Sequence, residues 1–146
     1  MKIVHVTDAS GKIVEPVWLK RAESVHRQLR TALPADYEGK MKRVFAGGAR
    51  MCIAADREAV RGVAVYRIGE NTFEGLHLYV DDLVTDERQR SRGVGRALME
   101  HLQELAQAAG CEAATLDSGT QRTQAHKFYF REGMVVSSFH FRKPLK

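Results

Sequence analysis

A short segment rich in glycine and arginine is the part of this sequence best suited to bind an anion. It reads Arg90-Ser91-Arg92-Gly93-Val94-Gly95-Arg96 and stands where an amphipathic helix begins. The N-terminus of a helix carries unpaired N–H groups and partial positive charge, glycines let an anion approach the backbone closely, and arginines add charge-assisted hydrogen bonds. We therefore expect this segment to bind phosphate.

The surroundings of this segment favour a phosphate-bearing small molecule over nucleic acid. The formal net charge of +5 suits a polyanionic partner of either kind. However, no aromatic residues interleave with the arginines, although single-stranded nucleic acid is usually bound by stacking on aromatic side chains. The lysine of a Walker loop is absent, and Leu98 stands where a dinucleotide fingerprint needs a third small residue. We expect a phosphate-bearing cofactor and no nucleic-acid partner.

The rest of the chain must form the elements that position this segment. Apolar residues at helical spacing predict helices from Val14 to Leu33 and from Gly93 to Ala109, with shorter ones over 35–46 and 122–131. Strand-like stretches cover 2–6, 51–55, 60–68, 76–85, 111–116 and 134–141. Polar turns at 56–58 and 69–71 predict two antiparallel hairpins. The expected fold is one α/β domain over residues 1–146, with a mixed, mostly antiparallel sheet flanked by helices.

The composition indicates the cellular location of this domain and the state of its cysteines. The chain is 44% hydrophobic and 28% charged, which is typical of a soluble globular protein. Its apolar runs are too short to cross a bilayer, and its start lacks the pattern of a signal peptide, so we expect a cytoplasmic protein without a membrane partner. Cys52 and Cys111 form neither a disulfide framework nor a zinc pattern, so we expect reduced thiols and no metal.

Three motifs together resemble the GNAT superfamily of N-acetyltransferases. The acidic strand 79–85 and the following Arg90-x-x-Gly93-x-Gly95 resemble that family's acetyl-CoA motif. The later Arg122-x-x-Ala125-x-x-Phe128-Tyr129-x-x-x-Gly133 resembles its second motif, a short helix with a Phe-Tyr pair. The resemblance is close from Tyr79 to Gly133, and upstream only the order of elements matches. Ser91 and Asp81 depart from the pattern, because glycine and glutamate are common at these positions in the family.

The resemblance implies a direct transfer of an acetyl group from acetyl-CoA to an amine. The pantetheine arm would lie along a strand that splays from its neighbour at 111–116, and the glycine-arginine loop would wrap the pyrophosphate. The residues implied to bind the cofactor are Leu83, Val84, Thr85, Arg90, Ser91, Arg92, Gly93, Val94, Gly95, Arg96 and Arg122. Tyr129 matches the family's general acid, and Asp81 matches the acidic residue that acts as a base through a water molecule. His77 and Glu74 are competing candidates for the base.

The acceptor follows less directly from the sequence. Glu74, Asp81 and Asp82 could border an acidic cleft, which would favour a small amine or a polyamine-like acceptor. Arg122 and the basic pair at 142–143 could instead hold an anionic amine. A homodimer is a further expectation. The alternatives are a non-catalytic acyl-CoA-binding regulatory domain and an acetyltransferase that acts on lysines or N-termini of proteins.

Overall fold

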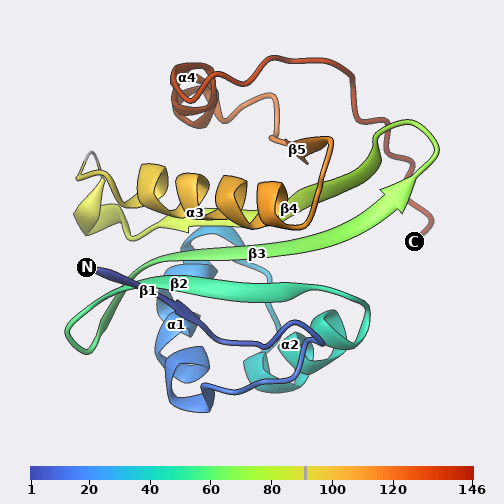
Figure 1. Ribbon diagram of the computed structural model, residues 1–146. Coiled ribbons are helices and arrows are strands. Elements are labelled where there is room, and N and C mark those ends of the chain that lie inside the picture. The colour runs from blue at the N-terminus through green and yellow to red at the C-terminus, as the bar shows by residue number, and fades with distance from the viewer. Residues whose placement is uncertain (91) are drawn as a thin grey trace. The chain divides into compact units, whose positions relative to one another are not determined.

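A sheet of five strands forms the centre of the fold (Figure 1). The computed structural model describes residues 1–90 and 92–146. The strands lie side by side in chain order: β1 (Lys2–His5), β2 (Arg50–Asp56), β3 (Ala59–Asn71), β4 (Gly75–Thr85) and β5 (Ala113–Leu116). The first four strands pair antiparallel. A crossover through a helix joins β4 to β5, and such a connection joins parallel strands. The sheet is therefore mixed and mostly antiparallel, as predicted.

Helices cover both faces of this sheet (Figure 1). The helices α1 (Pro16–Leu29) and α2 (Tyr37–Ala46) lie on one face, and α3 (Val94–Ala108) lies on the other. Pro16 begins α1, where its missing N–H costs nothing, and the Asp36 side chain caps α2 by accepting from Gly39 N at 3.0 Å. A single 3₁₀ turn, η1 (Glu87–Gln89), precedes α3.

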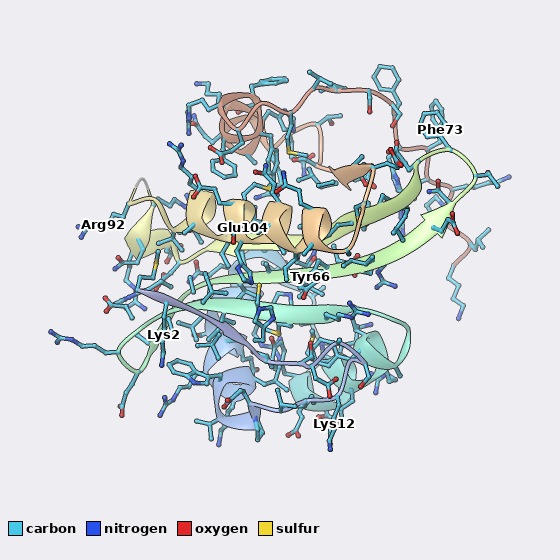
Figure 2. All side chains as sticks on the ribbon, viewed as in Figure 1. Lys2, Lys12, Tyr66, Phe73, Arg92 and Glu104 are labelled. Carbon is cyan, nitrogen blue, oxygen red and sulfur yellow. The ribbon has the colours of Figure 1, made fainter. Side chains whose placement is uncertain are left out.

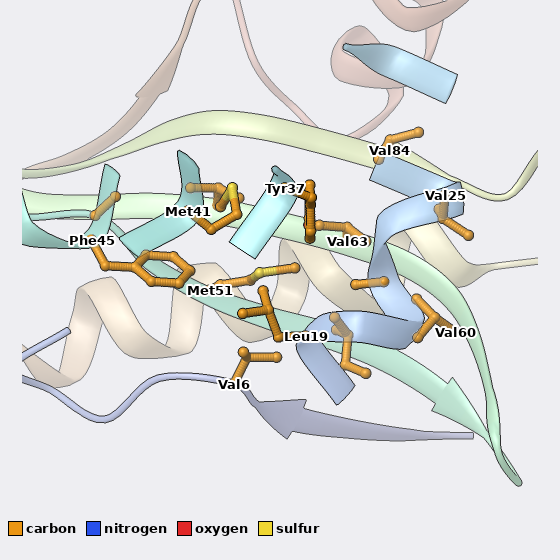
Figure 3. Close-up of a cluster of buried hydrophobic side chains, with 14 of the residues drawn as sticks. Val6, Leu19, Val25, Tyr37, Met41, Phe45, Met51, Val60, Val63 and Val84 are labelled. Atoms are coloured by element: carbon orange, nitrogen blue, oxygen red, sulfur yellow. The ribbon is translucent and has the colours of Figure 1, made fainter. Parts of the chain in front are cut away.

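The main hydrophobic core lies between the sheet and the two N-terminal helices (Figure 3). Apolar side chains of α1 and α2 meet alternate residues of β2 and β3 there, which is the pattern that strand periodicity predicts. The buried members include Leu19, Val25, Tyr37, Met41, Phe45, Met51, Ile53, Val63 and Val65. One polar side chain, His26, lies among them at 1% exposure. A buried imidazole needs partners for both nitrogens, and the site described below contains them.

The chain divides into two compact units, Met1–Thr115 and Leu116–Lys146. The first contains β1 to β4, the helices α1 to α3 and β5 as far as Thr115. The second contains α4 (Thr123–Arg131) and an extended stretch from residue 134 to the C-terminus.

The strand predicted from Met134 to Phe141 is wrong, because the structure assigns no strand to these residues. Alternating apolar residues favour an extended backbone, but a strand also needs a neighbouring backbone to pair with. Val135, Phe139 and Phe141 are 80%, 82% and 93% exposed. These residues pair with no strand among the described residues.

Two other boundaries also differ from prediction. The first helix spans only Pro16–Leu29, because Val14 N donates to Val6 O in a loop and Leu33 follows the end of the helix. The strand β3 continues to Asn71, so the second turn lies at 72–74 and not at 69–71. Asn71 Oδ1 accepts from Phe73 N and Glu74 N and so closes this turn. The first hairpin turn, at Arg57 and Glu58, agrees with prediction.

The contact between β3 and α3 gives a stability prediction at Gly62. A Cβ atom added there would lie 2.8 Å from Leu98 Cδ1 and 2.8 Å from Val94 Cγ1, so the helix would have to move away from the sheet. We expect Gly62→Ala to lower the free energy of unfolding by about 1–3 kcal/mol, the usual cost of overpacking. Urea denaturation measures this. Gly69→Ala is the control, because it lies on the same strand with nothing within 4 Å of the added atom.

A histidine pair joins the edge strand to α3 and predicts a loss of stability in acid. His5 Nε2 lies 2.9 Å from His101 Nε2, so one ring donates and the other accepts. Burial, and then the charge of His101, hold the pKa of His5 below its ordinary value. Because the unfolded chain then binds the proton more readily, stability from this pair is complete above about pH 6.5 and declines as the pH falls towards the folded pKa. Urea denaturation at pH 7.5 and 5.5 should show a smaller pH effect in His5→Gln than in the parent.

Candidate functional site

The loop between β4 and α3 is anchored at its start by a buried carboxylate. Asp86 is 1% exposed, and its Oδ1 accepts from Gln28 Nε2 of α1 (3.2 Å) and from Arg88 N (3.3 Å). Burial alone would raise the pKa of Asp86, but the hydrogen bonds from Gln28 and Arg88 outweigh it and the pKa is lowered. Gln28 Oε1 in turn accepts from Glu87 N. These bonds fix the first residues of the predicted phosphate loop to the fold.

The end of this loop forms the N-terminus of α3. Gly93 is the N-cap residue with φ of 80°, a conformation that favours glycine. It brings no side chain, so no side-chain cap occupies the first N–H groups of α3 among the residues described. Arg92 lies on the same loop and is exposed (Figure 2). The geometry leaves a helix N-terminus open towards solvent, which suits an anion. Ser91 lies outside the described residues.

The other predicted loop residues fall on both sides of this helix start. Val94 is buried at 4% exposure and anchors the first turn of α3. Gly95 follows it in the helix, and Arg96 Nε donates to Glu100 Oε1 one turn later, at 2.9 Å. Arg90 is exposed next to η1. Arg90, Arg92 and Arg96 therefore lie at the surface around the start of α3.

The strand β4 extends beyond its neighbour β5 towards this loop. Leu83, Val84 and Thr85 pair with β3 on one side. On the other side, Glu112 N donates to Leu76 O at 2.7 Å, so β5 begins opposite the start of β4. The four residues of β5 rise about 3.3 Å each and reach about the level of Val80. The outer edge of β4 from Leu83 to Thr85 thus lies beyond the reach of β5.

A bulge interrupts β4 just before this edge. Val65 pairs with Asp82 and Tyr66 with Val80, so Asp81 is an extra residue without a partner on β3. Strict alternation would turn the side chains of Asp81 and Asp82 to opposite faces. The bulge removes that alternation, and both carboxylates line the same cavity.

This cavity lies in the first unit between α1, α2 and β4 and has a volume of about 680 Å³. Its size falls in the range of small-molecule sites. Part of its wall is apolar, from Leu29, Leu33, Pro34, Met41 and Val44. Its ionisable groups are Arg30, Lys40, Arg67, Asp81, Asp82 and His26, while Tyr79 adds a phenol.

Each cavity carboxylate is paired with an arginine. Arg67 Nη2 donates to Asp81 Oδ2 at 2.7 Å, and its Nε contacts both oxygens at 3.1 and 3.2 Å. The hydrogen bond to Asp81 raises the pKa of Arg67. Arg30 Nε donates to Asp82 Oδ1 at 2.6 Å, and Arg30 Nη2 donates to the backbone oxygen of Asp81 at 2.9 Å. Two arginines therefore hold the bulge by its carboxylates and its backbone.

A buried histidine links the cavity to the core. His26 Nε2 lies 2.7 Å from Asp82 Oδ2, and its Nδ1 lies 2.8 Å from the hydroxyl of Tyr37. Burial would raise the pKa of Asp82, but His26 and Arg30 outweigh this and the pKa is lowered. Because the ionised carboxylate can only accept, His26 Nε2 donates to it and Nδ1 accepts from Tyr37. Burial raises the pKa of Tyr37, so this hydroxyl remains a donor.

The competing base candidates lie elsewhere on the same strand. His77 lines a second cavity of about 340 Å³, and its Nδ1 lies 3.0 Å from Gly75 O. Since a carbonyl only accepts, Nδ1 carries a proton and donates to it. Glu74 lies in the turn before β4.

Tyr129 and Arg122 belong to the second unit. Tyr129 lies on α4 with its ring centroid 5.4 Å from that of Phe128, and Arg122 is the N-cap residue of α4. Asp81, Asp82 and the start of α3 thus belong to the first unit, while the proposed acid lies on a helix of the other unit.

Four ionisable residues that line the cavity were not among the candidates from the sequence: His26, Arg30, Lys40 and Arg67. His26 had a usable signal, because it falls on the apolar stripe of α1 beside Ala22 and Val25, where an ionisable residue needs a partner. The other three are basic residues that look like solvated surface positions in the sequence. Their pairing with β4 depends on contacts between residues far apart in the chain.

Residues 1–90 and 92–146 contain no group of three or more His, Cys, Asp or Glu side chains that could hold a metal ion. In the same residues, no helix is long and apolar enough to cross a membrane. Cys52 is buried and Cys111 half-buried, and both are free. Burial raises the pKa of the Cys52 thiol to about 12, which makes it a poor nucleophile.

Comparison with known proteins identifies the family of this fold and site. Residues 18–134 match the acetyltransferase (GNAT) family, which is most of the chain. This chain belongs to the GNAT family. The match includes the phosphate loop, the bulged strand and the helix with Tyr129, so it covers every element named above as part of the site.

Two curated relatives resemble part of this GNAT chain. An uncharacterized N-acetyltransferase, YhdJ, from Bacillus subtilis (strain 168) is 41% identical over 73 residues, which cover 49% of this chain and 51% of that protein. The aminoalkylphosphonate N-acetyltransferase of Salmonella typhimurium (strain LT2) is 36% identical over 66 residues, which cover 45% of this chain and 43% of that protein. The matches thus span about half the length of these relatives or less.

Solved structures share the GNAT fold over the whole chain. A putative acetyltransferase from Agrobacterium tumefaciens (strain C58) has a TM-score of 0.79 at 22% identity and covers 99% of both chains. AAC(6')-Iy in complex with a CoA bisubstrate analogue has a TM-score of 0.79 at 17% identity, covering 98% of this chain and 97% of that one. At these identities the likeness shows a common fold and no more.

Proposed function

We propose that this chain is an N-acetyltransferase that transfers an acetyl group from acetyl-CoA directly to a primary amine of a small molecule. The observation that carries the proposal is the N-terminus of α3 without a side-chain cap among the described residues, which follows the end of β4 that extends beyond β5, in a chain of the GNAT family. The cavity between α1, α2 and β4 is the proposed acceptor site.

We propose the same acetyl-CoA-binding residues as the sequence analysis. The backbone of Leu83, Val84 and Thr85 pairs with the pantetheine arm, since that edge needs a partner. The loop 90–96 binds the pyrophosphate through N–H groups of α3 and its arginines. Arg122 adds a further cation for the phosphates. One of the similar folds is a complex of AAC(6')-Iy with CoA, which supports a CoA site in this fold.

The proposed reaction is a direct attack of the amine nitrogen on the thioester carbonyl. Asp81 accepts a proton from the ammonium through a water molecule, which leaves the nitrogen lone pair free. A C–N bond forms, the C–S bond breaks, and the departing thiolate takes a proton from the hydroxyl of Tyr129. The nitrogen loses its second proton as the amide forms, and that proton restores the Tyr129 hydroxyl. A tyrosine, with a pKa of about 10, is protonated at neutral pH, and its transfer to a thiolate of pKa about 8.5 is uphill by only about 2 kcal/mol.

The role of Asp81 predicts a change in the pH–rate profile. In Asp81→Asn the base is lost, so we expect the rate to fall most at low pH, where free amine is scarce. The loss should be about tenfold or more below the optimum and smaller at high pH. Steady-state rates from pH 6 to 9.5 measure this. A profile that overlays the parent's would transfer the role to His77 or Glu74, and His77→Gln is the matched comparison.

The experiment that tests the proposed function combines binding and turnover. Calorimetry should detect acetyl-CoA binding to the parent, and replacing Gly95 by a bulky residue should abolish it by blocking the approach of the anion to the backbone. Thiol release should then be measured over amines of several classes. An absence of CoA binding to the parent would exclude the cofactor, whereas binding without any thiol release would favour a non-catalytic acyl-CoA-binding domain.

The preference for small molecules over protein tails rests on the cavity and on named relatives. One relative is an aminoalkylphosphonate N-acetyltransferase, and one similar fold carries an analogue containing acetylneamine. A lysine-rich peptide should be included in the amine panel, because turnover of the peptide alone would favour the protein acetyltransferase instead.

A further inference from the structure

The charges around the 680 Å³ cavity do not form the acidic cleft that the sequence suggested. Asp81 and Asp82 do line it, but three cationic side chains, Arg30, Lys40 and Arg67, line it as well. Each carboxylate is already paired at short distance, Asp82 with Arg30 at 2.6 Å and Asp81 with Arg67 at 2.7 Å. A polycation entering this cavity would therefore meet no carboxylate that lacks a cationic partner.

Lys40 differs from the two arginines. It lies on α2, is half-buried and faces the cavity. No carboxylate forms an ion pair with it in residues 1–90 and 92–146. Its neighbour Lys42, in contrast, is 63% exposed and pairs with Glu38 at 3.4 Å. A lysine that lines a cavity and has no carboxylate partner is attracted to an anion that enters the same space.

The arginines add donors without losing their own partners. Arg30 uses Nε and Nη2 for Asp82 and the Asp81 backbone, and its side chain remains 51% exposed. An anion near Lys40 therefore adds to the existing ion pairs and does not displace a carboxylate. The apolar residues Leu33, Met41 and Val44 complete the wall around Lys40.

We propose that this cavity binds an amine whose other end carries an acidic group, a carboxylate or a phosphonate, and that Lys40 pairs with that group. The inference rests on the proposed acetyl transfer and names its substrate class. The amine end lies towards the bulge of β4, where Asp81 and Asp82 stand, and the acidic end lies towards α2. Selectivity thus comes from the acidic end at Lys40, while the amine end faces carboxylates that already have arginine partners.

Matched acceptors test this proposal. Thiol release from acetyl-CoA should be measured with 2-aminoethylphosphonate and β-alanine, and with propylamine and putrescine, which lack an acidic group. We expect kcat/KM to be about ten- to a hundredfold higher for the acidic amines, the effect of one charge-assisted hydrogen bond. A comparison of 2-aminoethylphosphonate with β-alanine shows whether a phosphonate or a carboxylate is preferred. Equal or faster turnover of propylamine or putrescine would overturn the proposal.

Two lysine substitutions on α2 test whether Lys40 causes the preference for acidic amines. Lys40→Met keeps the length of the side chain and removes its charge, so KM for the acidic amines should rise about ten- to a hundredfold while kcat and the rate with propylamine stay unchanged. Lys42→Met is the control and should behave as the parent. A loss in Lys40→Met that is equal for acidic and neutral amines would contradict a role in anion recognition.

A binding measurement keeps this test independent of acetyl transfer. Calorimetry should detect 2-aminoethylphosphonate binding to the parent in the presence of CoA, and weaker binding to Lys40→Met. If no amine is acetylated but this difference is found, the proposed activity fails and the anion site stands. If acetylation occurs but Lys40→Met binds the phosphonate as the parent does, the activity stands and the anion site fails.

Discussion

Tyr129→Phe should lower the rate of acetyl transfer by about ten- to a thousandfold, the range for loss of one general acid. The substitution removes only a hydroxyl, and the ring next to Phe128, at 5.4 Å between centroids, is retained. Packing of α4 should therefore survive. Affinity for CoA should remain within about twofold, because the proposed role begins only when the thiolate leaves. Thiol release gives the rate and calorimetry gives the affinity.

A second substitution separates chemistry from packing. Phe128→Leu weakens the aromatic contact on the same helix but leaves the Tyr129 hydroxyl in place. We expect Phe128→Leu to lower the melting temperature more than the turnover, and Tyr129→Phe to do the reverse. Unaltered turnover in Tyr129→Phe would mean that another group protonates the thiolate. A further sign of the acid is the alkaline limb of the pH–rate profile, which should be lost in Tyr129→Phe.

The sequence predicted the sheet and helices because their signals are local. Apolar stripes and polar turns at fixed spacing placed α3, the hairpin at Arg57 and the strand β4 within a few residues. The strand at 134–141 failed for a physical reason. Alternation in Val135, Phe139 and Phe141 describes what a strand would look like, but pairing depends on a neighbouring backbone that local sequence does not reveal.

The glycine-arginine loop was predictable for the same reason as the helices. Its chemistry lies in consecutive residues, and Gly93 takes the left-handed conformation at the start of α3 where an anion site needs it. The role of each residue towards a cofactor remains a prediction. Ser91, a departure from the family pattern, lies outside the described residues.

The charges of the acceptor cavity could not be predicted in this way. Asp81 and Asp82 looked like free acids in the sequence, and only the fold brings Arg67 of β3 and Arg30 of α1 against them. The net charge of the residues that line the cavity therefore depends on these ion pairs between distant parts of the sequence. The bulge at Asp81 matters equally, because it turns two successive side chains towards one cavity, which a regular strand does not do.

The network around His26 predicts the largest effect on stability. His26 is 1% exposed and donates to Asp82 at 2.7 Å while accepting from Tyr37 at 2.8 Å. His26→Leu fills similar space but leaves the Tyr37 hydroxyl and one oxygen of Asp82 without partners. Removing the donor to a buried carboxylate and the acceptor of a buried hydroxyl is costly, so we expect the free energy of unfolding to fall by about 2–4 kcal/mol. The melting temperature should fall by about 5–15 °C.

The pH dependence of the same variant distinguishes a lost charge interaction from a lost packing contact. The pKa of Asp82 is lowered in the folded protein, so its contribution to stability is present above the unfolded value near ~3.9 and is lost as the pH falls through the folded value. Without His26 this contribution shrinks, so the difference in the free energy of unfolding between the parent and His26→Leu should be smaller at pH 2.5 than at pH 7. A packing defect alone would give the same difference at both pH values.

Two more variants test whether the hydrogen bond from His26 to Asp82 stabilises the fold. His26→Gln can place an amide donor near the position of Nε2, so it should recover part of the stability that His26→Leu loses. His77→Leu is the matched control, because His77 is half-buried and its ring bonds only to the Gly75 carbonyl among the contacts described. It should cost less than about 1 kcal/mol. If His26→Leu and His77→Leu lower the free energy of unfolding equally, or if His26→Gln is no better than His26→Leu, then the hydrogen bond to Asp82 does not stabilise the fold as its geometry indicates.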